Sequence, residues 1–212
     1  MGDVKPQAKS AGGASTTAPG GPSLFSIESW QAYFNLNQFE LAERLMICVD
    51  PRKMEIEPHI TEKPEFYTPF WASACLIFTL FVFGNLSSSK EAYNYELISA
   101  GVSYIFGYLL FVPLVIYLFA KIQNSQSSYS HLINLFGYSL LPYLPASVLA
   151  VVRYSLFQYL VLFAALGLSS LLLLKNLKKI VKFENDYTAF IGTCIAIGVQ
   201  FLFTVFMKLK FY

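Results

Sequence analysis

Charged residues are scarce in this chain. Only 13% of its 212 residues are charged, whereas 55% are hydrophobic and 17% aromatic; a soluble domain normally carries about a quarter charged residues. Cysteine and histidine are rarer still and widely spaced, at Cys48, Cys75 and Cys194 and at His59 and His131. This spacing argues against a disulfide framework, a metal site or a redox site. The net charge of +2 is too small to favour nucleic acid as a partner.

Ionisable residues are also absent from the interior of five long apolar runs. Each run approaches the ~20 residues that a helix needs to cross a hydrocarbon core about 30 Å thick. The runs cover residues 70–86, 97–119, 132–152, 154–174 and 189–207. The sequence therefore predicts an all-α membrane protein, a bundle of five transmembrane helices with a cytosolic N-terminal arm. Proton relays, ion pathways and membrane metal sites usually need ionisable side chains inside the bilayer, so we do not expect these functions. Gln158 and Gln200 suit hydrogen bonds between helices.

The distribution of lysine and arginine predicts the orientation in the membrane. No apolar signal region precedes the first run, so we expect the first span to act as its own insertion signal. Basic residues gather before that span and in the expected loop between spans four and five, at Arg44, Arg52, Lys53, Lys63, Lys175, Lys178, Lys179 and Lys182. The positive-inside rule then favours a cytosolic N-terminus and a lumenal C-terminus. The four lysines of the loop either serve topology alone or also bind an acidic partner or lipid headgroup.

Asn85 opens an Asn-Leu-Ser sequence that matches a glycosylation acceptor and would face the lumen. It adjoins the end of the first apolar run, where a transferase has little access. We therefore expect the acceptor to stay unused.

The composition divides the chain into a disordered tail, a cytosolic arm of short amphipathic helices and linker, and a membrane domain, at residues 1–23, 24–65 and 66–212. Aromatic residues Trp30, Tyr33 and Phe34 stand in the arm. One interpretation makes them a docking surface for a partner. The other places the apolar face of the arm on the bilayer or on the cytosolic end of the bundle.

The run E-F-Y-T-P-F-W, residues 65–71, leads into the first span. Pro69 suits the first turn of a helix, where its missing N–H costs nothing. Tyr67 and Trp71 suit the headgroup layer, because each has an apolar body and a polar edge. Together with Phe70 they are candidates for partner binding, although anchoring at the interface alone would explain the run.

The third span contains the run G-Y-S-L-L-P-Y-L-P, with candidate residues Gly137, Tyr138, Ser139, Pro142 and Pro145. Two prolines three residues apart free backbone carbonyls and kink a helix. Neighbouring helices, serine hydroxyls or water must then satisfy these carbonyls. The kink either shapes the bundle or moves during function.

These motifs, in this order, resemble the Yip family, the Ypt/Rab-interacting membrane proteins of the early secretory pathway, and within it the YIPF branch of Golgi membranes. In that branch the first-span run is typically D-L-Y-G-P-F-W, from which Glu65, Phe66 and Thr68 depart. The third-span run is similar to G-Y-S-L-x-x-Y-I-P, and residues 30–37 are similar to Y-Y-Q-x-F-F-D-V-D-T, with asparagine at both acidic positions. The resemblance covers about residues 24–207 and indicates a divergent member.

The resemblance implies a non-enzymatic protein of vesicle trafficking between endoplasmic reticulum and Golgi. Such a protein binds prenylated Rab-type GTPases or other Yip proteins, in homo- or hetero-oligomers, and needs no cofactor. An alternative is a scramblase-like carrier of lipids or small molecules, which depends on grooves more than on buried charge. A membrane enzyme is disfavoured, because the sequence shows neither paired carboxylates nor a nucleophile with a base.

Overall fold

The structure is a computed structural model that describes residues 43–44, 46–48, 54–62, 64–88, 93–123, 125, 127–183 and 185–212. Every regular element in these ranges is a helix. Five helical segments are long and apolar enough to cross a membrane. They are α4 (Tyr67–Ser87), α5 (Glu96–Ile122), the pair α6 (Tyr129–Ser139) and α7 (Tyr143–Leu149), α8 (Ser155–Val181) and α9 (Asp186–Phe211). The predicted all-α fold with five spans is confirmed.

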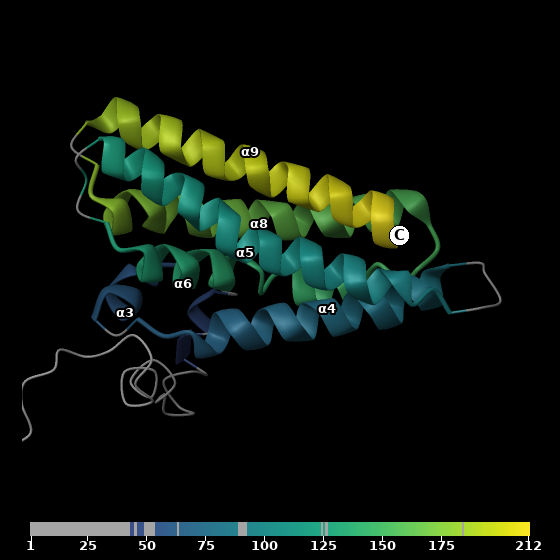
Figure 1. Cartoon of the computed structure of the whole chain (residues 1–212). Helices are drawn as coiled ribbons and strands as arrows, with labels where there is room; N and C mark the ends of the chain where they lie inside the picture. Colours follow the sequence, from purple (N-terminus) through teal and green to yellow (C-terminus); the bar gives the residue numbers. More distant parts are fainter. Residues whose placement is uncertain are drawn as a thin grey trace, which may run out of the picture.

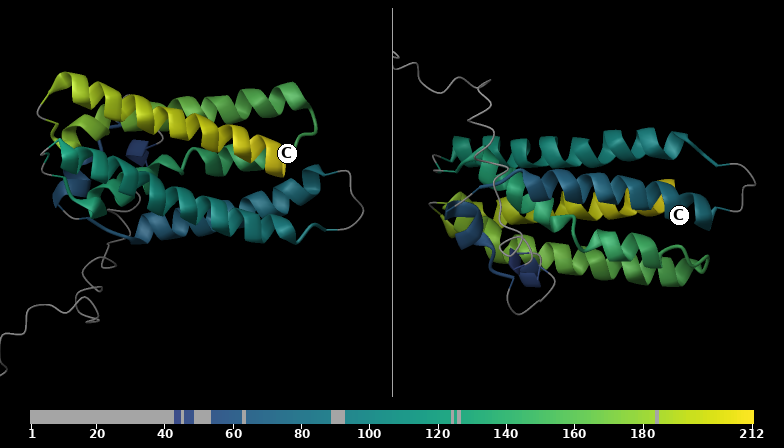
Figure 2. Two further views of the ribbon diagram at one scale, coloured as in Figure 1. Left: turned by 45° about the horizontal axis from the view of Figure 1, so that its top comes forward. Right: turned by 90° about the horizontal axis from the view of Figure 1, so that it is seen from below.

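The helices lie side by side along one axis, and α6 and α7 follow one another in the middle (Figures 1 and 2). The third span contacts α4, α5 and α8. It is the core of the bundle, since 72% of its most apolar stretch is buried, against 33–39% in the other spans. The short helix α3 (Glu57–Glu62) packs on α6 and α8 at one end of the bundle. We call this the arm end; the C-terminus lies at the opposite end (Figure 1).

The third span is interrupted where its prolines predict an interruption. α6 ends at Ser139, and the N–H groups of Leu140 and Leu141 bond three residues back, to the carbonyls of Gly137 and Tyr138, at 3.1 and 3.2 Å. α7 then starts directly after Pro142 and holds Pro145 in its first turn, where a missing N–H is tolerated. Pro142 has no N–H to donate to the carbonyl of Ser139, three residues back. The freed carbonyl of Ser139 accepts the hydroxyl of Ser169 on α8 at 2.7 Å. A hydroxyl of a neighbouring helix thus pairs the carbonyl that the break frees. Such pairing within the protein is required in a bilayer, where no water is available to backbone groups.

Two connections contain more helix than the sequence indicates. The expected linker before the first span holds α3, whose Ile60 is fully buried. So short a helix is not stable alone, and its packing on the bundle offsets the entropy lost on ordering it. α8 continues to Val181, so Lys175, Lys178 and Lys179 lie on its last turns and not in a loop. Lysine is a good helix former, and its long stem can keep the ammonium in water. Of the four lysines, only Lys182 lies beyond α8; it directly follows Val181 and has a left-handed φ of 51°.

Candidate functional site

One buried amide holds the arm on the bundle. Asn176 of α8 accepts the backbone N–H groups of Ile56 and Glu57 through Oδ1 at 2.8 and 3.0 Å, and its Nδ2 donates to the carbonyl of Met54 at 2.7 Å. The side chain thereby pairs three backbone groups of the arm much as a neighbouring strand would. Met54, Ile56 and Ile60 are fully buried beside it. The described part of the arm therefore packs on the end of the bundle, in line with the second interpretation of its apolar face.

Cys48 provides a chemical marker for this packing. Its side chain is fully buried and belongs to the same apolar core as Met54 and Ile56. Burial raises the pKa of the Cys48 thiol to about 12, because the thiolate loses its hydration. The thiol should stay unreactive while the arm remains seated.

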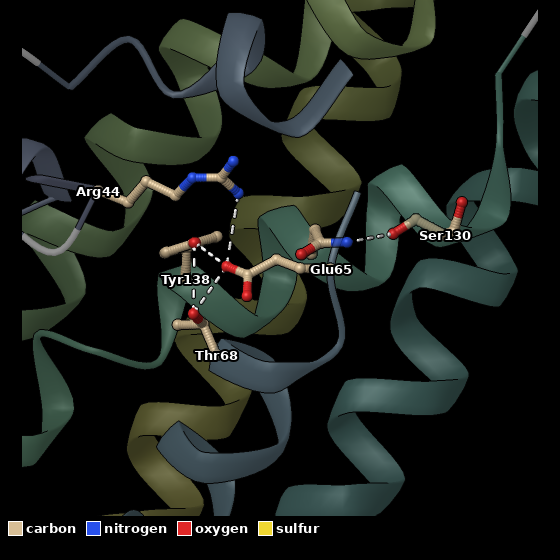
Figure 3. A network of polar contacts seen from close by, with 6 residues as sticks. Arg44, Glu65, Thr68, Ser130 and Tyr138 are labelled. Carbon is tan, nitrogen blue, oxygen red and sulfur yellow. Dashed lines mark hydrogen bonds and ion pairs between the residues drawn. The ribbon is translucent and has the colours of Figure 1, made fainter. Parts of the chain in front are cut away.

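A buried carboxylate joins the arm to two spans (Figure 3). Nη1 of Arg44 lies 3.5 Å from Oε1 of Glu65, and only 4% and 1% of the two residues is exposed. The hydroxyl of Thr68 donates to the same oxygen at 2.8 Å, and so does the hydroxyl of Tyr138. A buried charge is stable only when it is paired and hydrogen bonded. Glu65 therefore couples the arm, the start of α4 and the C-terminal end of α6.

The first-span and third-span motifs meet at this carboxylate. A Cβ built on Gly137 would lie 2.5 Å from Cβ and 2.7 Å from Cα of Pro69. Glycine lets the two helices approach until Tyr138 reaches Glu65 and Thr68. We call this contact, made by Glu65, Thr68, Pro69, Gly137 and Tyr138, the seam.

The aromatic candidates of the first span lie apart from the seam. Phe70 and Trp71 are about half exposed, and their ring centroids are 5.8 Å apart. The ring of Tyr67 lies 6.2 Å from that of Trp71. Of the four candidates in this run, Pro69 belongs to the seam, through its approach to Gly137. Trp30, Tyr33 and Phe34 lie outside the described residues.

Comparison with known families decides the relationship of this chain. The model of the Yip1 domain matches residues 47–207. The chain belongs to the Yip1 domain family. It is also similar to a protein named YIPF1 homolog from Dictyostelium discoideum, with 27% identity over 199 residues, which is 90% of this chain and 57% of that protein. The chain thus spans little more than half the length of this relative. No solved structure matches it.

Family membership confirms the resemblance and, with the five spans, a multi-pass membrane protein. In this Yip1-domain chain, two departures from the typical first-span run, Glu65 and Thr68, are hydrogen bonded to each other at 2.8 Å. The larger carboxylic acid and the added hydroxyl thus belong to one contact.

A second polar cluster surrounds Gln200 at the break in the third span. Gln200 accepts the hydroxyl of Tyr108 and donates to that of Ser169. The Tyr143 hydroxyl lies 3.3 Å from Nε2 of Gln200 and 2.7 Å from the hydroxyl of Thr204. The prediction that Gln200 bonds between helices is confirmed. Of the third-span candidates, Ser139 joins this cluster, 3.4 Å from the Tyr108 hydroxyl, while Pro142 and Pro145 shape the backbone beside it.

The side chain of Asn85, the predicted glycosylation acceptor, makes hydrogen bonds within the protein. Oδ1 of Asn85 accepts the N–H of Asn94 at 2.6 Å, and Nδ2 donates to the carbonyl of Phe81 at 2.8 Å. Asn85 lies inside α4 and is 9% exposed. This geometry supports the expectation of an unused acceptor.

Arg44 and Asn176 were missed as members of the site. Arg44 counted only as a topology signal, and Asn176 stands among the lysines that a loop was expected to hold. A single amide between Lys175 and Leu177, near the end of a span, was the available signal, because a polar side chain facing a core needs a partner. The identity of that partner could not be read from residues more than a hundred positions away.

Proposed function

We propose that this Yip1-domain protein is a non-enzymatic adaptor of vesicle trafficking in the early secretory pathway and Golgi. In this proposal its arm end faces the cytosol, its C-terminus faces the lumen, and it binds prenylated Rab-type GTPases or other Yip proteins. The observation that carries the proposal is the bonding of Glu65 to Arg44 of the arm, Thr68 of α4 and Tyr138 of α6. A partner that displaces or holds the arm would thereby act directly on the interrupted span.

The surface near Glu65 and the start of α4 suits the binding of a protein partner. Phe70 and Trp71 offer half-exposed aromatic rings, a residue type that often dominates the energy of protein interfaces. Lys179 of α8 pairs with Glu55 of the arm at 3.1 Å, and both side chains are exposed. Charged side chains of the bundle and of the arm therefore lie next to each other on this surface. A prenyl group would add on the order of 0.8 kcal/mol for each buried CH₂, which favours the lipidated form of a GTPase.

Affinity purification of the full chain, tagged at the N-terminus and solubilised in detergent, tests the proposal. Mass spectrometry should recover prenylated Rab-type GTPases or another five-span Yip protein. Phe70→Ala should lower this capture at least fivefold. Phe201→Ala is the matched control, because Phe201 is 45% exposed against 48% for Phe70 but lies fifteen residues along α9 from the arm end.

Two outcomes contradict the proposal. Equal affinity for prenylated and unprenylated GTPase would remove the role of the lipid. Recovery of a specific lipid with neither GTPase nor Yip protein would favour the carrier alternative.

A further inference from the structure

A groove of about 440 Å³ lies on the outer face between α5 and α9. The rings of Tyr104, Tyr108 and Phe203 line it, and Gly107 also contributes to its surface. A Cβ built on Gly107 would meet nothing within 4 Å. This glycine therefore allows no close helix contact and instead leaves space in the groove.

The groove lies at the depth of the hydrocarbon core. Gly107 is eleven residues from the start of α5 at Glu96 and fifteen from its end at Ile122, roughly 16 and 22 Å along the axis at the helical rise. Phe111 and Leu202 border the groove and are 68% and 63% exposed. In a span, such exposure is contact with lipid. The centre of the groove is nearer to the end that is opposite the arm.

The groove offers aromatic rings and few polar atoms to an occupant. The hydroxyl of Tyr108 is already bonded to Gln200 and lies 3.4 Å from that of Ser139. The rings of Tyr104 and Phe203 are stacked, with centroids 5.5 Å apart, so this wall is flat and apolar. The volume lies within the 300–1,000 Å³ typical of small-molecule sites. An apolar chain is the chemistry that this surface fits.

Three kinds of molecule could fill the groove: a second copy of this protein, a prenyl group on a partner protein, or a lipid of the bilayer. Two turns of a neighbouring helix, about 10 Å wide and 11 Å long, occupy roughly 850 Å³, about twice the space, so a second copy would insert side chains only. A prenyl group carried by a protein on the arm side would enter from the nearer leaflet, whereas Leu202 and Phe203 of the groove lie in the half of α9 that is farther from the arm. A bilayer lipid in the opposite leaflet reaches this depth directly.

We propose that the groove between α5 and α9 holds one acyl chain of a phospholipid from the leaflet opposite the arm. The floor residue Tyr108 connects this site to Gln200 and the break in the third span. The site is separate from the surface of the proposed function, so either proposal can fail without the other.

Photolabelling tests the proposal on the full chain in phosphatidylcholine vesicles. A few per cent of the lipid carries a diazirine in the middle of one acyl chain, and mass spectrometry maps the adducts. Adducts should concentrate on Tyr104 and Phe203, at least fivefold above the exposed Leu160 and Leu171 of α8. Gly107→Leu should lower the groove adducts at least fivefold. Gly167→Leu is the matched control, since its Cβ also meets nothing within 4 Å but lies on α8.

Several results would overturn the proposal. Even labelling of all lipid-facing residues would reduce the groove to ordinary lipid contact; this map of the unaltered chain does not depend on whether a variant folds. Unchanged groove labelling in Gly107→Leu would do the same. Dimers in native mass spectra that disappear in Gly107→Leu would identify a second copy as occupant. Competition by an equimolar geranylgeranylated peptide would identify a prenyl chain.

Discussion

Gly137 and Gly107 occupy similar apolar stretches of sequence, yet the structure uses them in opposite ways. A Cβ on Gly137 would collide with Pro69 at 2.5 Å, whereas one on Gly107 would meet nothing within 4 Å. The first glycine closes the seam, where the close approach brings the hydroxyl of Tyr138 to Glu65 and Thr68. The second leaves the groove between α5 and α9 open to lipid. A small residue in a membrane helix therefore indicates either contact or space, and only its neighbours decide which.

The charge at the seam should produce the largest effect. Arg44→Ala leaves Glu65 buried without its cationic partner, which costs about 3–5 kcal/mol. Unfolding by SDS in mixed micelles measures the loss. Arg44→Leu combined with Glu65→Leu should recover most of it, because no buried charge remains. A double variant as unstable as Arg44→Ala would show that the charges themselves are not the cause.

Substitution of the two glycines tests the comparison directly. Gly137→Ala must push α6 away from the backbone of Pro69, so we expect a loss of about 1–3 kcal/mol. Gly107→Ala should lose nothing and could gain up to about 1 kcal/mol from helix propensity. The same SDS unfolding experiment measures both. Equal effects of the two substitutions would contradict the contrast between seam and groove.

Asn176→Ala should release the arm with a smaller loss of stability. Three backbone groups of Met54, Ile56 and Glu57 lose their side-chain partner, at about 1–3 kcal/mol if they stay buried and less if water replaces it. Alkylation of Cys48 at pH 8 reports the release, because the raised pKa of the seated thiol keeps it unreactive.

We expect this alkylation to accelerate at least tenfold in Asn176→Ala, in a background of Cys75→Ser and Cys194→Ser. Leu174→Ala, a half-exposed position on the same helix, serves as control and should leave the rate unchanged. An unreactive Cys48 in Asn176→Ala would mean that the other contacts hold the arm.

The exposed ion pair between Lys178 and Asp186 should have the smallest effect. Lys178 and Asp186 lie 2.6 Å apart in solvent-exposed positions, where water and salt screen the attraction. Lys178→Ala should leave SDS unfolding unchanged within error. A loss of stability comparable to that of Arg44→Ala would contradict the view that burial makes the Arg44–Glu65 pair energetically important.

The sequence predicted the spans more accurately than the contacts between them. The runs that begin at Phe70 and end near Met207 correspond to α4 through α9, and Pro142 and Pro145 marked the break in the third span. The extent of α8 was missed, because lysines can end a span and still continue its helix. The motif around Pro69 and that around Gly137 were both recognised, but nothing in either indicated that they touch.

What this sequence determined by itself is the set of local properties. A segment enters a membrane through its own apolar side chains, and a proline interrupts a helix through its own missing N–H. The tertiary structure alone decided that Tyr138 reaches Glu65, 73 residues away, that Asn176 holds the arm, and that one glycine closes a seam while another leaves a groove. These depend on the rotation and height at which helices pack, which many side chains set together.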